Sequence, residues 1–127
     1  MLITPAYAAV FGLFFVVLSV RTLRLRRKLG IYIGSGDNPR MIRAARVHSN
    51  FAEYVPLALI LIYFGEMQHG MALWAHLLCI ALMIGRISHA FGVSQVDEDT
   101  RYRVAGMAFT FFTIISASLR ILVNYLF

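Results

Sequence analysis

The sequence contains little charge, one cysteine and few acidic residues. Asp, Glu, Lys and Arg make up only 14% of the 127 residues, hydrophobic residues make up 60%, and the mean hydropathy is +0.73. These values lie well away from those of an ordinary soluble globular domain. The single Cys79 excludes an internal disulfide, and we expect a buried, unreactive thiol. The composition therefore indicates a protein that folds in a lipid bilayer.

Several signatures of enzymes and metal proteins are absent as well. The sequence has no internal repeat, no Gly-rich phosphate-binding loop and no Cys/His spacing typical of metal ligands, so we predict no metal site. The amino terminus has no cationic segment before its apolar run. We therefore expect the first apolar segment to be retained as a membrane helix rather than cleaved as a signal peptide.

Four apolar segments are long enough to cross a membrane, which takes roughly 20 predominantly apolar residues. We expect spans at residues 2–20, 51–64 with the helical turns before them, 71–92 and 104–127. Asn38 followed by Pro39 resembles a helix start, so the second helix is predicted to begin there and to continue to about residue 66. The predicted fold is all-α: an integral membrane, four-transmembrane-helix bundle that forms a single domain over residues 1–127.

The cations are concentrated at one end of this predicted bundle. Twelve Lys and Arg residues outnumber six Asp and Glu residues, and eight of the twelve lie between residues 21 and 46. The second connection, residues 65–70, holds none. Because cationic loops favour the cytosol, we place loops one and three inside and both termini outside. Topology and anionic lipid explain the basic cluster better than nucleic acid does.

A polar stripe on the second predicted helix is the candidate site. At 100° per residue, Arg46, Asn50 and Glu53 fall on one side of the helix, and Arg43 lies beside them. The other positions are apolar too, so the stripe needs polar partners on neighbouring helices or a polar ligand. The cytosolic ends of the other helices carry further ionisable groups, namely Arg24 on the first, Arg86 and His89 on the third, and Arg101 and Arg103 on the fourth.

This convergence needs an explanation, because an ionisable group in a membrane helix costs roughly 2.5–3.5 kcal/mol on insertion scales. One interpretation is structural: Glu53 pairs with an arginine, and the remaining cations extend to the lipid headgroups. The other interpretation is an anionic ligand held between helices near the cytosol. The excess of cations over carboxylates in this layer favours the ligand.

These residues resemble those of a known family. The pattern Arg46-x-x-x-Asn50-x-x-Glu53-Tyr54-x-Pro56 is similar to the second-helix signature of the membrane-associated proteins in eicosanoid and glutathione metabolism, the MAPEG family. The resemblance covers nearly the whole chain. Three further segments resemble the ends of the other family helices: Arg24-Leu-Arg-Arg-Lys28 on the first, Arg86-x-x-His89 on the third, and Arg103-Val-Ala-Gly106 on the fourth.

The resemblance implies a homotrimer that binds glutathione between neighbouring subunits near the cytosolic face. It also implies a glutathione-dependent transferase or peroxidase that acts on a hydrophobic electrophile or a lipid hydroperoxide. The alternative is a non-enzymatic membrane protein of the same scaffold that binds glutathione or lipid or serves as a structural partner. By position, the implied glutathione contacts are Arg24, Arg46, Asn50, Glu53, Arg86 and His89, and the implied thiolate-stabilising residue is Arg103, with Arg101 as runner-up.

Two positions depart from the eicosanoid synthases of the family. Both synthases carry a tyrosine at the position of Val93, for which Tyr102 is a candidate substitute. The prostaglandin synthase also carries an arginine at the position of Ser49. The resemblance therefore favours a general conjugating or peroxide-reducing role over an eicosanoid-specific activity.

The cation distribution makes a prediction about topology. Reporter fusions at Gln68, in the loop without cations, and at Asp97, in the third loop, should report opposite compartments, with Asp97 in the cytosol. Paired reporters that are active on only one side of the membrane make this measurement. The same compartment for both positions would contradict the four-span arrangement.

Overall fold

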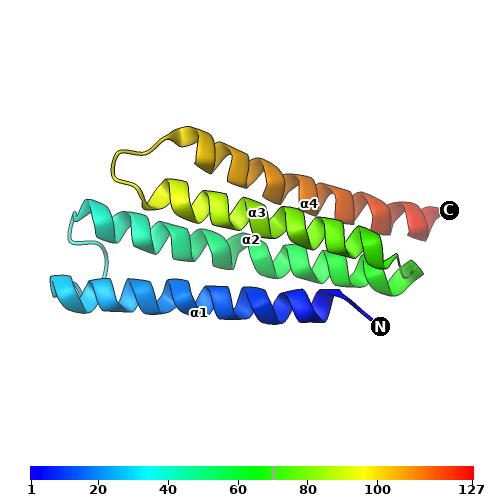
Figure 1. Ribbon diagram of the computed structural model, residues 1–127, viewed down its shortest axis with the longest axis horizontal. Helices are drawn as coiled ribbons and strands as arrows, with labels where there is room; N and C mark the ends of the chain where they lie inside the picture. Colours follow the sequence, from blue (N-terminus) through cyan, green and yellow to red (C-terminus); the bar gives the residue numbers. More distant parts are fainter. Residues whose placement is uncertain (70) are drawn as a thin grey trace.

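The computed structural model describes residues 1–69 and 71–127 and contains four long helices over these residues (Figure 1). They are α1 (Thr4–Leu29), α2 (Pro39–His69), α3 (Ala72–Ser94) and α4 (Thr100–Leu126). All four are long and apolar enough to cross a membrane. The predicted all-α bundle of four membrane helices is thus confirmed. Gly70, which belongs to the predicted second loop, lies outside the described residues.

All four helices extend further than the predicted spans, since α3 ends at Ser94 rather than residue 92 and α4 begins at Thr100 rather than residue 104. The extensions of α1 and α2 lengthen the two ends of the bundle. α1 continues past residue 20 through the basic cluster to Leu29, where Gly30 adopts φ 68° and its N–H bonds back to the last turn. Glycine suits this left-handed cap, and cations in the last turn favour the negative end of the helix. α2 continues to His69 rather than to about residue 66. Hydropathy located the lipid-embedded part of each helix, whereas capping decides where the helix stops.

Side-chain caps determine where α2 and α4 begin. The Asn38 Oδ1 atom accepts hydrogen bonds from the backbone N–H groups of Arg40 at 3.0 Å and Met41 at 3.2 Å, as predicted for this helix start. The Asp99 carboxylate accepts from the backbone N–H of Arg101 at 3.0 Å. A carboxylate or amide oxygen at this point satisfies free backbone donors of the first turn. Both caps lie at the end of the bundle that holds the polar residues.

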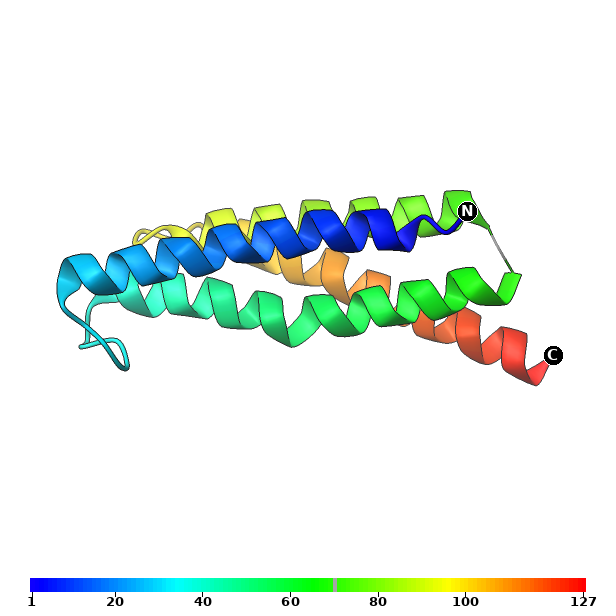
Figure 2. The ribbon, with the colours of Figure 1, turned by 90° about the horizontal axis from the view of Figure 1, so that it is seen from below.

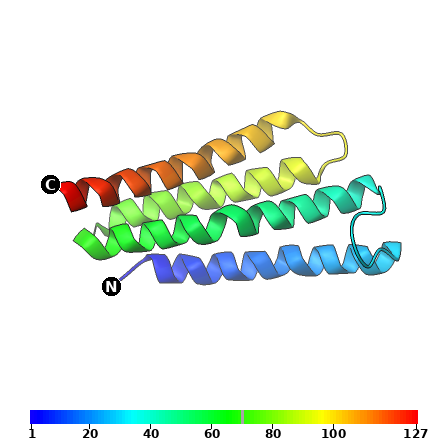
Figure 3. The ribbon, with the colours of Figure 1, turned by 180° about the vertical axis from the view of Figure 1, so that it is seen from behind.

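The helices run alternately up and down, so one end of the bundle holds both the α1–α2 and the α3–α4 connections (Figures 1 and 3). α2 and α3 are the central helices: each packs against the three others, whereas α1 and α4 share no contact over the described residues. α4 packs mainly on α3 and runs obliquely to the other helices (Figure 2). This arrangement brings the polar ends of all four helices to the same end of the bundle, as predicted.

The core consists of apolar side chains, and so does most of the outer surface. Phe11, Phe51 and Leu82 lie in one buried cluster, and the expected buried Cys79 lies in a second one nearer the termini. Large apolar side chains such as Phe112 also point outward. Because lipid is as apolar as the core, van der Waals packing and polar contacts, rather than the hydrophobic effect, hold such helices together.

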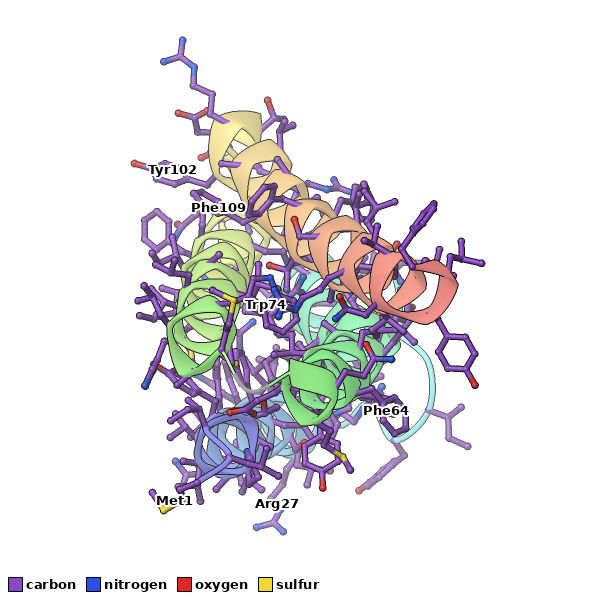
Figure 4. All side chains as sticks on the ribbon, turned by 90° about the vertical axis from the view of Figure 1, so that its right-hand side faces the viewer. Met1, Arg27, Phe64, Trp74, Tyr102 and Phe109 are labelled. Atoms are coloured by element: carbon purple, nitrogen blue, oxygen red, sulfur yellow. The ribbon has the colours of Figure 1, made fainter. Side chains whose placement is uncertain are left out.

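α3 and α4 approach each other closely at Gly85 and Gly106, and again at Gly92 beside Tyr102. A Cβ atom at Gly106 would lie 2.6 Å from the backbone oxygen of Gly85 and 2.7 Å from the Cβ atom of His89, and one at Gly85 would lie 2.8 Å from the Cβ atom of Phe109. Phe109 flanks this contact at the side of α4 that faces α3 (Figure 4). Small residues allow membrane helices to approach in this way. The approach brings the neighbouring Arg86 within reach of α4.

At the end of the bundle that holds the termini, Glu66 of α2 anchors the start of α1. Its carboxylate accepts hydrogen bonds from the backbone N–H of Ile3 at 2.5 Å, the backbone N–H of Thr4 at 2.9 Å and the hydroxyl of Thr4 at 2.7 Å. An anion is favoured at the amino terminus of a helix, where backbone donors are unpaired. Glu66 therefore performs the capping that the Ile3 side chain does not provide.

We predict that Glu66→Gln lowers the free energy of unfolding by about 1–3 kcal/mol. The NH₂ group of the glutamine would face a backbone N–H group at the start of α1, and two hydrogen-bond donors cannot pair. Thermal unfolding in detergent, followed by circular dichroism, measures this loss. Asp97→Asn is the matched control, since Asp97 is an exposed carboxylate at the other end. Equal melting temperatures for the two variants would contradict the capping role.

Candidate functional site

A buried polar cluster joins α2, α3 and α4 near the end that holds the two polar connections. Its centre is Arg86, which is 1% exposed. The Arg86 Nη2 atom donates to the Asn50 Oδ1 atom at 2.6 Å and lies 3.4 Å from the His89 Nδ1 atom, and the Nη1 atom donates to the Thr110 hydroxyl at 3.2 Å. The structure thus brings together three of the predicted site residues, Asn50, Arg86 and His89.

Arg86 is a buried cation without a carboxylate partner. It forms no salt bridge over residues 1–69 and 71–127, and its Nε atom has no hydrogen-bond partner there. The guanidinium also lies 5.9 Å from the centre of the Phe51 ring. An amide, a hydroxyl and a ring face reduce the cost of burying the charge but do not neutralise it. The cluster therefore creates a positive potential that favours an anion at the adjoining surface.

Arg46 and Glu53 lie on the outer face of α2, on the same stripe as the inward-facing Asn50. The Nη1 atom of Arg46 lies 3.0 Å from the Oε1 atom of Glu53, and the two side chains are 51% and 46% exposed. The pairing of Glu53 with an arginine is therefore present, within one helix. Exposed ion pairs contribute about 0–1 kcal/mol. A ligand that carries both an ammonium and a carboxylate can replace each partner of this pair at little cost.

Two pockets that share Arg103 lie at the start of α4, one between α4 and α2 and the other on α4 alone, and together we call them the α2–α4 groove. Arg103 lines both pockets. The first pocket has a volume of about 310 Å³, and we call it the polar pocket after its ionisable residues, which are Arg43, Arg46, Glu98 and Arg103. The second has a volume of about 330 Å³ and is otherwise apolar; it is lined by Val104, Met107, Ala108 and Phe111.

Glu98 organises the cations of the polar pocket. Its Oε2 atom accepts a hydrogen bond from the Arg43 Nη1 atom at 2.7 Å and lies 3.9 Å from the Arg103 Nη1 atom. Arg43 is thus held firmly, and it also donates to the backbone oxygen of Val93 at 3.1 Å. Among the residues that the structure describes, Arg103 makes only this long contact with an acidic group, and its side chain is half exposed. Arg101 lines neither pocket, so Arg103 is the better placed of the two predicted candidates.

Arg24 is the one predicted site residue that lies apart from the others. Within one chain it lines a separate pocket with Arg21, Lys28 and Arg40, on the α1 side of the bundle. α1 and α4 share no contact over the described residues. A single subunit therefore does not bring Arg24 to the α2–α4 groove.

The tyrosine that the family's eicosanoid synthases carry has no equivalent in the groove. Val93 lines the polar pocket with an apolar side chain that is 3% exposed. Tyr102, the candidate substitute, lies in neither pocket. Its ring packs edge to face against Phe91 at 5.1 Å, and it projects from the start of α4 over α3 (Figure 4). The geometry of one chain therefore does not support Tyr102 as a replacement for the tyrosine that the synthases carry at the position of Val93.

Sequence patterns alone did not identify several polar partners. Thr110 stands in an apolar run, so its neighbours in the sequence do not mark it. It accepts a hydrogen bond from Arg86 because it lies one turn after Gly106, on the face of α4 that meets α3. Glu98 is one of three consecutive acidic residues, and only the fold selects it for Arg43. On the α1–α2 side, Ser19 and His48 are joined by a 2.9 Å hydrogen bond and line a further pocket of about 420 Å³.

Comparison with known proteins supports this picture. Residues 4–123 match the MAPEG family. The chain is also similar to two relatives called "Inner membrane protein YecN", from Escherichia coli strain K12 and from Escherichia coli O6:H1 strain CFT073. Each is 30% identical over 109 residues, which cover 86% of this chain and 82% of the relative.

The family match and the helices agree on the type of protein. The four membrane-spanning helices and the inner-membrane relatives make this chain an integral, multi-pass membrane protein. The predicted second-helix residues Arg46, Asn50 and Glu53 all lie at the polar end of the bundle, where two of them face outward and one faces Arg86. With a match over nearly its whole length, the chain belongs to the MAPEG family.

Proposed function

We propose that this protein is a membrane glutathione-dependent transferase or peroxidase that works as a homotrimer. The observation that carries the proposal is the α2–α4 groove, where a polar pocket and an apolar pocket meet at Arg103. A charged thiol peptide and a hydrophobic second substrate need two adjoining environments of this kind. Membership of the MAPEG family supports glutathione as the thiol.

The charged groups of the groove match those of glutathione, which carries two carboxylates and one ammonium at neutral pH. Arg46 suits a carboxylate, because charge-assisted and bidentate bonds to arginine are strong, and Glu53 suits the ammonium. Both side chains are half exposed and bonded only to nearby residues of α2. Behind them, Asn50 and His89 hold Arg86, whose charge attracts the anionic ligand.

The proposed trimer accounts for the place of Arg24. Over the described residues α1 does not contact α4, and the groove residue Arg103 is half exposed, so the groove can accept a neighbouring molecule at its outer side. A neighbouring subunit that covers this side would bring its own Arg24 toward the bound thiol peptide and bury the polar stripe of α2 away from lipid. The polar stripe and the open side of α4 thus support intersubunit sites.

Arg103 is the proposed catalytic residue. When bound, glutathione supplies a thiol whose deprotonated form attacks an electrophilic carbon or a peroxide oxygen. A thiol with a reference pKa of about 8.5 is mostly protonated at neutral pH. Arg103 remains charged, offers several donors and makes only a 3.9 Å contact with Glu98. Its attraction stabilises the thiolate, and partial desolvation at the membrane surface strengthens that attraction.

The second candidate is a non-enzymatic protein of the same scaffold, and Val93 favours it. This buried valine offers no hydroxyl to a bound thiol. Glutathione-dependent turnover of a generic aryl halide or of a lipid hydroperoxide distinguishes the two candidates. Turnover supports the enzyme, and binding without turnover supports the scaffold role.

Glutathione affinity tests whether Glu53 binds the ammonium group of glutathione. Glu53→Gln should weaken binding by roughly 1.5–3 kcal/mol, or about 10- to 150-fold, because a charge-assisted hydrogen bond to the ammonium is lost. Calorimetry on the detergent-purified protein measures the affinity, and Asp97→Asn removes a carboxylate outside the groove as a control. Unchanged affinity in folded Glu53→Gln protein would return this residue to a purely structural role.

Variants of Arg103 and Arg101 test whether Arg103 stabilises the glutathione thiolate. Arg103→Ala should abolish the thiolate absorbance of bound glutathione and lower turnover by about 100-fold or more, the usual loss when one charge-stabilising donor is removed. Arg101→Ala should retain both signals, since Arg101 lines neither pocket. The reverse result would move the role to Arg101. No effect in either variant would refute this mechanism.

A further inference from the structure

A large pocket at the polar end of the bundle lies on the α1 side, away from the α2–α4 groove, and we call it the basic pocket. Its volume is about 690 Å³, which is within the range of ligand-binding sites. It forms where the end of α1, the start of α2 and the α3–α4 connection meet. Its ionisable lining residues are Arg21, Arg24, Lys28, Arg40 and Asp97.

The four cations of the basic pocket have no carboxylate partners. Over residues 1–69 and 71–127, salt bridges involve Arg43, Arg46 and Arg103, which all lie on the other side of α2, but none of the four cations here. One carboxylate, Asp97, accompanies four positive charges in the lining. Like charges that line one pocket repel each other, and an anion between them offsets that repulsion. The pocket therefore has the electrostatics of an anion site.

Arg21 gives the basic pocket a rigid wall. Its side chain is half-buried, and its Nη1 atom donates to the Ser94 hydroxyl at 2.9 Å. Ser94 in turn donates to the backbone oxygen of Ala90. This chain of bonds ties the end of α1 to the end of α3, so one guanidinium is already oriented before any ligand binds. An oriented guanidinium suits the planar, bidentate recognition of phosphate oxygens.

The apolar part of the pocket indicates which phosphate compound it takes. Leu25 and Val96 line it beside the cations, and α1 continues from there into the membrane with exposed side chains such as Val20 and Leu23. The cation distribution also assigns this end to the cytosol, where the leaflet is rich in anionic lipids. A lipid headgroup places its phosphate between the cations and its glycerol and first methylenes against the apolar wall. A free phosphate would leave that wall unused.

From these observations we propose that the basic pocket is a binding site for the phosphate headgroup of an anionic phospholipid of the cytosolic leaflet. This site is separate from the proposed glutathione site, since Arg46, Glu53 and Arg103 do not line it. Arg24 is common to both proposals, so the test leaves it unchanged. Bound lipid would neutralise the repelling cations and hold the ends of α1, α2 and α3 together.

The test compares two double variants that remove the same charge. Lys28→Gln with Arg40→Gln removes two cations of the pocket, whereas Arg27→Gln with Arg101→Gln removes two exposed cations outside it. Figure 4 shows Arg27 pointing away from the bundle. An exposed cation paired with a phosphate contributes up to about five-fold to affinity. Binding of phosphatidylglycerol in neutral detergent should therefore fall by up to roughly 25-fold in the pocket variant and less than about twofold in the control.

Native mass spectrometry of retained lipid provides the measurement, with phosphatidylcholine as the neutral lipid and inorganic phosphate as the soluble competitor. The single variant Lys28→Gln should lose up to about five-fold, which keeps the test valid if the double variant misfolds. Equal losses in pocket and control variants would reduce the effect to overall charge and refute the site. Equal retention of both lipids would also refute it. Displacement of lipid by an equal concentration of inorganic phosphate would refute the lipid assignment in favour of a soluble phosphate ligand.

Discussion

The buried charge of Arg86 is the constraint on which the polar end of this protein depends. A guanidinium inside a membrane bundle is costly unless its donors are satisfied. The guanidinium has one polar partner on each of three helices: the Asn50 amide on α2, the His89 imidazole on α3 itself and the Thr110 hydroxyl on α4. Gly85 and Gly106 bring α4 close enough for that hydroxyl to reach. Three helices are therefore aligned by one side chain.

The two ends of the bundle use polar groups in different ways. At the end with the termini, Glu66 has its charge fully engaged in capping α1, and it is buried. At the other end, Arg46, Glu53 and Arg103 are half exposed and make weak or long contacts. Strongly bonded groups stabilise a fold, whereas weakly bonded charges can exchange partners with a ligand. The proposed catalytic site lies at the end of the bundle where the weakly bonded charges are concentrated.

α2 separates two surfaces that both carry more cations than carboxylates but differ in the size of that excess. On the α4 side, Glu98 and Glu53 accompany the cations, which suits a zwitterionic peptide. On the α1 side, four cations line one pocket with a single carboxylate, which suits a phosphate. Both surfaces include exposed side chains, Arg103 on the α4 side and Arg24 on the α1 side, so both are accessible from outside the chain. One short bundle thus has room for two chemically different ligands.

The sequence by itself determined the four membrane helices, their alternating direction, the family and the meeting of Arg46, Asn50, Arg86 and Arg103 at one end. These properties are local: hydropathy, the 3.6-residue period and capping depend on neighbouring residues. Only the tertiary structure decided that Asn50 turns inward while Arg46 and Glu53 turn outward, although all three share one stripe. It also decided that Arg103 rather than Arg101 borders both pockets, and that Arg24 lies apart. Those outcomes depend on which helix packs against which face, and helix period carries no information about that choice.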